Sequence, residues 1–265
     1  MGITTVFRLF DWSAFQPDKT LFPILSGRWW YMTAYFGIVL IMPYIGRLFD
    51  AITRKQASML VCAMIGMYSL FPTLYHADTF KLHSGYSMTW LMALAVIGGY
   101  IKRYDPFPKL RKGWLGLYVL FMSCICAYYF LGTGLNWEDP DRFVQFTSIF
   151  ALLGAISLMM FFARTDMKPW VRKITTLAAP TALGVYLIHV HPSVWNYILA
   201  GLFSSLARQN VLLMLLGVLG GALVIFVLCS LIDWVRAKLF QILKINTFAD
   251  FIGNKLTEIA QCIFK

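Results

Sequence analysis

Charged side chains are scarce in this sequence. Only 13% of its 265 residues are Asp, Glu, Lys or Arg, and only 12 of these are acidic, whereas 59% of all residues are hydrophobic. The mean hydropathy of +0.68 is far above what a soluble domain of this length can hide in one core. The composition therefore excludes an ordinary soluble domain and predicts a protein for which the lipid bilayer is the second solvent.

Motifs typical of soluble enzymes are also missing. The sequence has no Gly-rich phosphate loop with a Lys, no Gly-x-Ser-x-Gly elbow and no His-Glu-x-x-His helix. Its five cysteines lack the paired spacing of a zinc site or a disulfide framework, so we interpret them as reduced packing residues and expect no metal. The first residues lack the pattern of a removable signal. These motifs therefore identify no reaction.

Long apolar runs, in contrast, are abundant. A helix needs about 20 mostly apolar residues to cross the hydrocarbon layer, and seven runs approach that length. They cover residues 29–49, 57–75, 87–101, 114–133, 143–163, 177–194 and 211–232. We therefore expect an all-α fold, a polytopic integral membrane bundle of about seven transmembrane helices.

The basic residues predict how this bundle is oriented. The 23 Lys and Arg residues lie in short clusters between the apolar runs rather than along one polar face, which argues against nucleic acid as a partner. Most of them fall in every second loop, and such basic loops stay on the cytoplasmic side of a membrane. We expect a multi-pass protein of the cell membrane with its N-terminus outside and its C-terminus in the cytoplasm.

The end of the chain is predicted to differ from the rest. Within residues 234–265, apolar side chains recur at steps of three and four, as in an amphipathic helix on the cytoplasmic membrane surface. These residues are Phe248, Ile252, Leu256, Ile259 and Ile263. The loops are too short to hold a soluble domain. Residues 1–265 are therefore expected to form a single transmembrane domain that ends in this tail.

Asp, Glu and Lys are absent from the predicted spans and the one Arg, Arg47, lies at the end of the first, which disfavours a charge-coupled transporter of glycans or lipids. The polar exception is His189, toward the outer end of the sixth run. An imidazole at that depth is costly unless it is bonded, so His189 either belongs to a functional site or makes a structural hydrogen bond. His191 lies two residues later and about 200° around a helix, so no shared metal is expected.

Two loops carry polar residues that have alternative interpretations. The outer loop with His76 and His83 either lines an access path for a polar acceptor or is a solvated connector. The cytoplasmic cluster that begins with Lys102 and Arg103 either meets the phosphates of a nucleotide-type donor or contacts anionic lipid headgroups. The residues alone leave both alternatives open.

Three segments, at residues 22–35, 85–104 and 184–192, are similar to segments of a known family and occur in the same order. The third reads Gly-Val-Tyr-Leu-Ile-His-Val-His-Pro and looks like the C-terminal signature of that family. Together they resemble the membrane acyltransferase-3 family, which in bacteria modifies surface polysaccharides and related glycans by O-acylation. The resemblance extends from about residue 22 to residue 232.

This resemblance implies transfer of an acyl group, commonly acetyl, from acyl-CoA on the cytoplasmic side to a glycan hydroxyl near the outer face. Acyl-CoA is a substrate in this reaction, and no bound cofactor is implied. The residue implied as catalytic is His189. Those implied to line the substrate path are Arg28, Tyr86, Trp90, Tyr186 and His191.

The resemblance also has a gap. Members of the family carry a proposed catalytic Arg and His in the first of about ten spans, whereas here no His precedes His76. We therefore expect the chain to begin after the third span of the family pattern. Alternatives are an inactive truncated remnant and a non-catalytic subunit completed by separately encoded N-terminal helices. Association into a homo-oligomer is also open.

Overall fold

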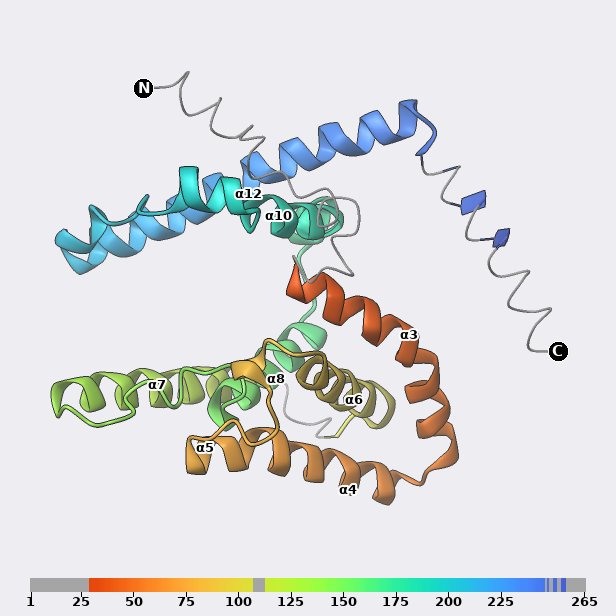
Figure 1. Ribbon diagram of the computed structural model, residues 1–265, viewed down its shortest axis with the longest axis vertical. Helices are drawn as coiled ribbons and strands as arrows, with labels where there is room; N and C mark the ends of the chain where they lie inside the picture. The colour runs from red at the N-terminus through yellow and green to blue at the C-terminus, as the bar shows by residue number, and fades with distance from the viewer. Residues whose placement is uncertain (1–28, 107–112, 246, 248–249, 252–253, 256–265) are drawn as a thin grey trace. The chain divides into compact units, whose positions relative to one another are not determined.

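The computed structural model describes residues 29–106, 113–245, 247, 250–251 and 254–255 (Figure 1). The regular structure of these ranges is helical throughout, with no strand among them. The described residues divide into two compact units: those up to 166, called here the unit of residues 16–166, and those from 167 onward, the second unit. An all-helical fold follows from the composition, because a helix satisfies its backbone hydrogen bonds within one segment.

Four described helices are long and apolar enough to cross a membrane. They are α3 (Trp30–Ala51), the continuous run Arg54–Tyr75, α7 (Gly113–Gly134) and α12 (Val211–Ile242). The second run consists of α4 (Arg54–Ile65), a π-helical turn η2 (Gly66–Leu70) and α5 (Phe71–Tyr75). It begins at a capping box in which Thr53 and Gln56 satisfy each other's backbone N–H groups.

The other three expected spans are helical but shorter, so the expected number of about seven is not confirmed. Helix α6 (Met88–Tyr104) has 17 residues and ends in Lys102 and Arg103, and α8 (Ile149–Ala163) has 15 residues. At about 1.5 Å per residue, α8 covers only about 22 Å of a hydrocarbon layer roughly 30 Å thick. The sixth expected span is divided among several short elements.

The unit of residues 16–166 packs its core around α6. Trp90, Val96 and Ile97 of α6 lie in one buried cluster with residues of α3, α4 and α8. The other buried members are Ile45, Phe49, Ala57, Val61, Leu82 and Leu152. Glycines bring these helices close together, as at Gly99, where an added Cβ would lie 2.9 Å from Cε2 of Phe49. Small residues at helix contacts are a common feature of membrane bundles.

A buried hydrogen-bond link connects α5 with α8. The Thr73 hydroxyl donates to the Ser69 carbonyl oxygen at 2.7 Å and accepts from the Ile149 backbone N–H at 2.9 Å. Ser148 caps the same end of α8 by accepting from the Ala151 backbone N–H. The two hydroxyl groups and both N–H groups that form this link are satisfied, as buried polar groups usually are, whereas the Ser69 hydroxyl beside them has no partner among the described residues. The link fixes where α8 begins.

In the second unit, a 3₁₀ turn that contains Pro180 separates two helices. The amphipathic helix α9 (Pro169–Ala178) is followed by the 3₁₀ turn η4 (Ala179–Thr181) and by α10 (Ala182–His189). Helix α9 exposes Trp170, Ile174 and Leu177, which recur on one helix face, whereas Arg172 lies on the opposite face. Basic and apolar faces of this kind suit the surface of a membrane rather than its interior.

Helix α12, with 32 residues, is the longest helix described in the second unit. It continues through Ile242, ten residues past the boundary expected at Ile232. Gly217 faces Leu206 at 2.6 Å from an added Cβ, and Gly221 faces Phe203, so the segment before α12 runs back along this helix. The apolar residues of the expected amphipathic tail, from Phe248 to Ile263, lie outside the described residues. That tail therefore stays a prediction.

Gly99 and Gly98 offer a matched test of the core packing. Replacing Gly99 by Leu is expected to destabilise the fold by about 1–3 kcal/mol, because the new side chain overlaps the buried ring of Phe49. Nothing lies within 4 Å of a Cβ added at Gly98, so Gly98→Leu is the control. Thermal unfolding in detergent should show a lower midpoint for Gly99→Leu alone. Equal midpoints for the two variants would contradict this packing.

Candidate functional site

His189 ends α10, and a hydrogen bond to the backbone holds its imidazole. Its Nδ1 lies 2.7 Å from the carbonyl oxygen of Val185, one turn earlier in the helix. Because a carbonyl oxygen only accepts, Nδ1 carries the proton in the neutral ring, and Nε2 keeps its lone pair. The ring is half-buried, and its edge meets the ring of Tyr186 at 6.0 Å between centroids. This arrangement leaves Nε2 as the basic atom.

His191 lies just beyond α10 and has a different environment. Its Nδ1 accepts a hydrogen bond from the Ser193 backbone N–H at 3.3 Å. The two histidines therefore use the same ring atom in opposite ways, since Nδ1 of His189 donates and Nδ1 of His191 accepts. Among the described residues no group of three or more His, Cys, Asp or Glu is placed to hold a metal ion.

Asp233 is the polar residue that sequence analysis missed in this region. It lies one residue past the expected end of the last span, yet α12 continues through it and its exposure is only 4%. It packs directly against Gly184 of α10, where an added Cβ would collide with the carboxyl group. Its Oδ1 accepts a hydrogen bond from Nε of Arg236 at 2.7 Å. The last expected span and this buried carboxyl group thus belong to one continuous helix.

A second polar contact joins the same two helical segments. The hydroxyl groups of Thr181 and Ser230 lie 3.0 Å apart. Thr181 comes one helical turn before Gly184, and Ser230 comes one turn before Asp233 in α12. His189 lies five residues after Gly184, or about 7 Å along the helix axis. The sequence signal for this cluster was weak, because a lone acidic residue after an apolar run is normally assigned to the membrane boundary.

Tyr86 and Trp90 occupy contrasting positions in the other unit. Trp90 is a core residue with 4% exposure, whereas Tyr86 is 49% exposed and lies edge-on to Trp30 and Phe146, at centroid distances of 4.8 and 5.5 Å. Gly85, just before Tyr86, has a φ of 103°, and a Cβ added to it would lie 2.8 Å from the Cβ of Phe146. Only glycine fits at this position. Trp90 therefore contributes to the packing of the core, whereas the side chain of Tyr86 remains exposed at the surface of the unit.

The structure gathers the predicted site residues in two groups. Tyr86 and Trp90 belong to the unit of residues 16–166, whereas Tyr186, His189 and His191 belong to the second unit. Arg28 lies outside the described residues. Their roles in substrate binding or catalysis remain predictions.

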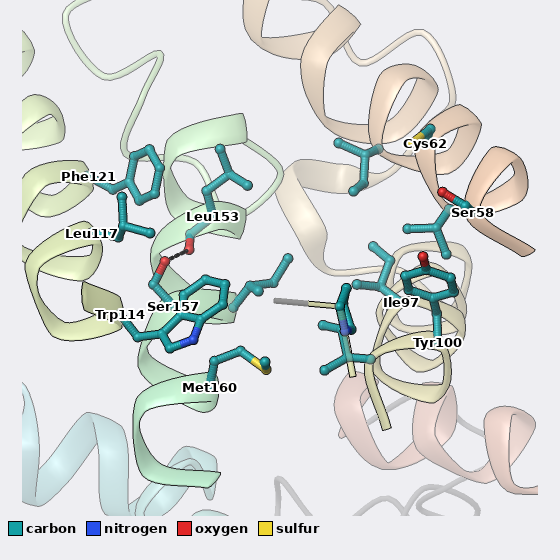
Figure 2. Close-up of a pocket in the computed structure, with 15 residues that line it drawn as sticks. Ser58, Cys62, Ile97, Tyr100, Trp114, Leu117, Phe121, Leu153, Ser157 and Met160 are labelled. Atoms are coloured by element: carbon teal, nitrogen blue, oxygen red, sulfur yellow. Dashed lines mark hydrogen bonds between the residues drawn. The ribbon is translucent and has the colours of Figure 1, made fainter. Parts of the chain in front are cut away.

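An apolar cavity of about 410 Å³ is the second feature that sequence analysis missed (Figure 2). It lies within the unit of residues 16–166 and is lined by side chains of α4, α6, α7 and α8. Figure 2 shows Trp114, Leu117 and Phe121 on one side of it and Ile97 and Tyr100 on the other. No predicted site residue lines it. Its lining comes from four separate apolar runs, so no local pattern indicated it.

Arginine side chains surround the end of the helices that line this cavity. The guanidinium of Arg164 lies 5.9 Å from the ring centroid of Trp114, and those of Arg54 and Arg103 lie 6.0 and 5.9 Å from that of Tyr104. Arg103 also donates to Asp50 at 2.6 Å, and Arg164 forms an ion pair with Asp105. These cation–π contacts and ion pairs hold the arginines at this end of the unit.

A family model described as "Acyltransferase domain" matches residues 2–234. The chain belongs to the acyltransferase-3 family. The match covers all three segments on which the expectation was based, which confirms the resemblance. No curated protein and no solved structure matched the chain. The family and the four long apolar helices together support a membrane acyltransferase.

The contact between Gly184 and Asp233 in this acyltransferase can be tested by a double-mutant cycle. Gly184→Ala is expected to lower stability by about 1–3 kcal/mol, because its methyl group overlaps the Asp233 carboxyl group. Asp233→Ala should recover part of that loss by making room, which gives a coupling energy of about 0.5–3 kcal/mol. The measurement is thermal unfolding in detergent.

Gly220→Ala is the control for this cycle, since nothing lies within 4 Å of a Cβ added at that position of α12. It should leave the unfolding midpoint unchanged or raise it slightly, because alanine favours a helix over glycine. Additive effects of Gly184→Ala and Asp233→Ala would mean that the two residues are not in contact.

Proposed function

We propose that this membrane acyltransferase transfers an acyl group from acyl-CoA to a hydroxyl group of a cell-surface polysaccharide or related glycan. The donor would approach from the cytoplasmic side and the acceptor from the outer side. The family supports the acyl-transfer chemistry, and the basic loops support the assignment of sides. No bound cofactor is needed, because the thioester already carries an activated acyl group.

The observation that carries this proposal is the hydrogen bond of His189. A general base for a hydroxyl must offer a lone pair in a fixed direction, and the bond from Nδ1 to the Val185 carbonyl oxygen leaves that lone pair on Nε2. The half-buried position of the ring and the neighbouring ring of Tyr186 limit its rotation. The expected topology puts this end of α10 toward the outer face, where the acceptor would arrive.

The reaction then follows from ordinary acyl-transfer chemistry. Nε2 of His189 takes the proton from the glycan hydroxyl while the hydroxyl oxygen attacks the thioester carbonyl carbon, which requires the thioester to reach from the cytoplasmic side to the level of His189. The tetrahedral intermediate collapses with cleavage of the carbon–sulfur bond, and the leaving thiolate takes up a proton, so that coenzyme A departs as a thiol. The new bond is an oxygen ester on the glycan, and the imidazole returns to its neutral form.

Two substitutions at His189 separate catalysis from a structural role. Both His189→Ala and His189→Gln are expected to lower acyl transfer by about 10² to 10⁴-fold, the usual contribution of a general base. Glutamine can still donate to the Val185 carbonyl oxygen but cannot act as a base. The measurement is ester formation on the glycan by membranes that contain equal amounts of each variant. Nearly full activity of His189→Gln would leave His189 with a structural role only.

Leu183→Ala serves as the control for this pair, because Leu183 lies in the same helix and is exposed to its surroundings. It removes apolar side-chain volume from α10 without changing a polar group. Activity close to that of the unchanged protein is expected. A loss as large as that of His189→Ala would show that the assay reports the integrity of α10 and not the base.

The proposed orientation is testable with single cysteines at two loops. In a chain whose five native cysteines are replaced by serine or alanine, Lys81→Cys should react with a membrane-impermeant maleimide in intact cells. Lys55, at the start of α4, belongs to a basic cluster expected in the cytoplasm, so Lys55→Cys should react only after the membrane is permeabilised. Labelling of both positions from outside would contradict the orientation.

A further inference from the structure

The cavity in the unit of residues 16–166 has the chemistry of a site for a hydrocarbon chain. Its volume of about 410 Å³ lies in the range of small-molecule sites, roughly 300–1,000 Å³. The cavity is partly open to its surroundings, so a chain can enter it from outside. Most of the lining is aliphatic or aromatic, and the Ser157 hydroxyl already donates to the Leu153 carbonyl oxygen at 2.7 Å. An occupant would therefore be bound chiefly through apolar contacts.

The lining residues are concentrated toward one end of this unit. They lie in the first half of α7 and of the run Arg54–Tyr75, in the last part of α6, and in the middle and later part of α8 from Leu153 to Met160. The start of α4 and the end of α6 are expected on the cytoplasmic side, as are the start of α7 and the end of α8. The cavity thus lies at the cytoplasmic end of this unit, the side from which an acyl donor would arrive.

The end of the unit next to the cavity carries net positive charge. Among the described residues, Arg47, Arg54, Lys55, Lys102, Arg103 and Arg164 lie at these helix ends, against Asp50, Asp105 and Asp166. Arg164 lies over Trp114, which itself lines the cavity, and Arg54 precedes the lining residue Ser58 by one helical turn. Apolar walls with a basic end match a ligand that has one hydrocarbon chain and phosphate groups at its other end.

We propose that this cavity binds the acyl chain of the donor thioester, and that the preferred chain is longer than acetyl. The proposal rests on the acyl-transfer function proposed above and names its donor more closely. An acetyl group would leave most of the cavity empty, whereas a chain of medium length fills it while the phosphates of coenzyme A meet the basic end. A phospholipid would fit less well, because its second tail would remain outside.

Binding of chain-length analogues tests the proposal without catalysis. Thioether analogues of acetyl-, butyryl-, octanoyl- and dodecanoyl-CoA cannot transfer their chain, so equilibrium binding to the full chain in nanodiscs can be measured for each. Each two added methylene groups that enter the cavity should tighten binding about tenfold, until the cavity is full. A chain brominated near its end should quench the fluorescence of Trp114, and Trp114→Phe should remove that part of the signal. Equal affinity for the acetyl and octanoyl analogues would overturn the proposal.

Two leucines of α7 provide a matched pair of filling variants. Leu117 lines the cavity, whereas Leu120 is exposed on the same helix and does not line it. Leu117→Trp should weaken binding of the octanoyl analogue about tenfold or more and leave the acetyl analogue nearly unchanged. Leu120→Trp should change neither. Ser58→Trp fills the same cavity from α4 and serves as a second filling variant if Leu117→Trp does not fold. Equal affinity of all three variants for the octanoyl analogue would contradict the site.

The same measurements separate the possible failures. If brominated phosphatidylglycerol in the nanodisc quenches Trp114 and the octanoyl analogue does not displace it, a lipid tail occupies the cavity and the proposal is wrong. If octanoyl transfer to the glycan is no faster than acetyl transfer, and Leu117→Trp changes neither rate, the function stands and the long-chain preference fails. If the octanoyl analogue binds as expected but no thioester supports transfer, the cavity site stands and the proposed function fails.

Discussion

The hydrocarbon layer sets the condition on which the rest of this structure depends. It offers no hydrogen-bond partners, so each segment within it must satisfy its backbone groups as a helix, and polar side chains are tolerated there only with partners. The link from Thr73 to Ser69 and Ile149 follows that rule, as does the bond from His189 to Val185. Where such a polar group keeps a free lone pair, as at His189 Nε2, chemistry becomes possible.

Close packing in this protein depends on glycine and leaves room only in particular places. At three glycines, a side chain of a neighbouring helix occupies the place that a Cβ would take, so the helices approach closely. These pairs are Gly99 with Phe49, Gly154 with Met122, and Gly184 with Asp233. The cavity beside Trp114 and Leu117 shows the opposite behaviour, because large side chains on four helices leave a volume unfilled. Because this cavity is partly open and has the volume of a small-molecule site, it is the place where we propose a ligand.

The sequence predicted the helical segments and the family better than the site. Apolar runs located α3, α7 and α12, because length and hydropathy are local properties. The same runs overestimated the fifth span, since residues 143–148 form turns before Ser148 caps α8, and they stopped α12 before Asp233. Both Asp233 and the cavity depend on which helices meet. Contacts between distant segments leave no periodic signal in any one of them.

The division of the chain also bears on how its chemistry can be organised. The proposed base, His189, belongs to the unit with residues 167–265, whereas the proposed donor cavity lies wholly within residues 16–166. Binding of the acyl chain and removal of the hydroxyl proton therefore depend on different sets of contacts. A change in the cavity acts on donor affinity and chain length, whereas a change at His189 acts on the chemical step. Evolution of a new donor preference could thus proceed in the first unit without altering the base.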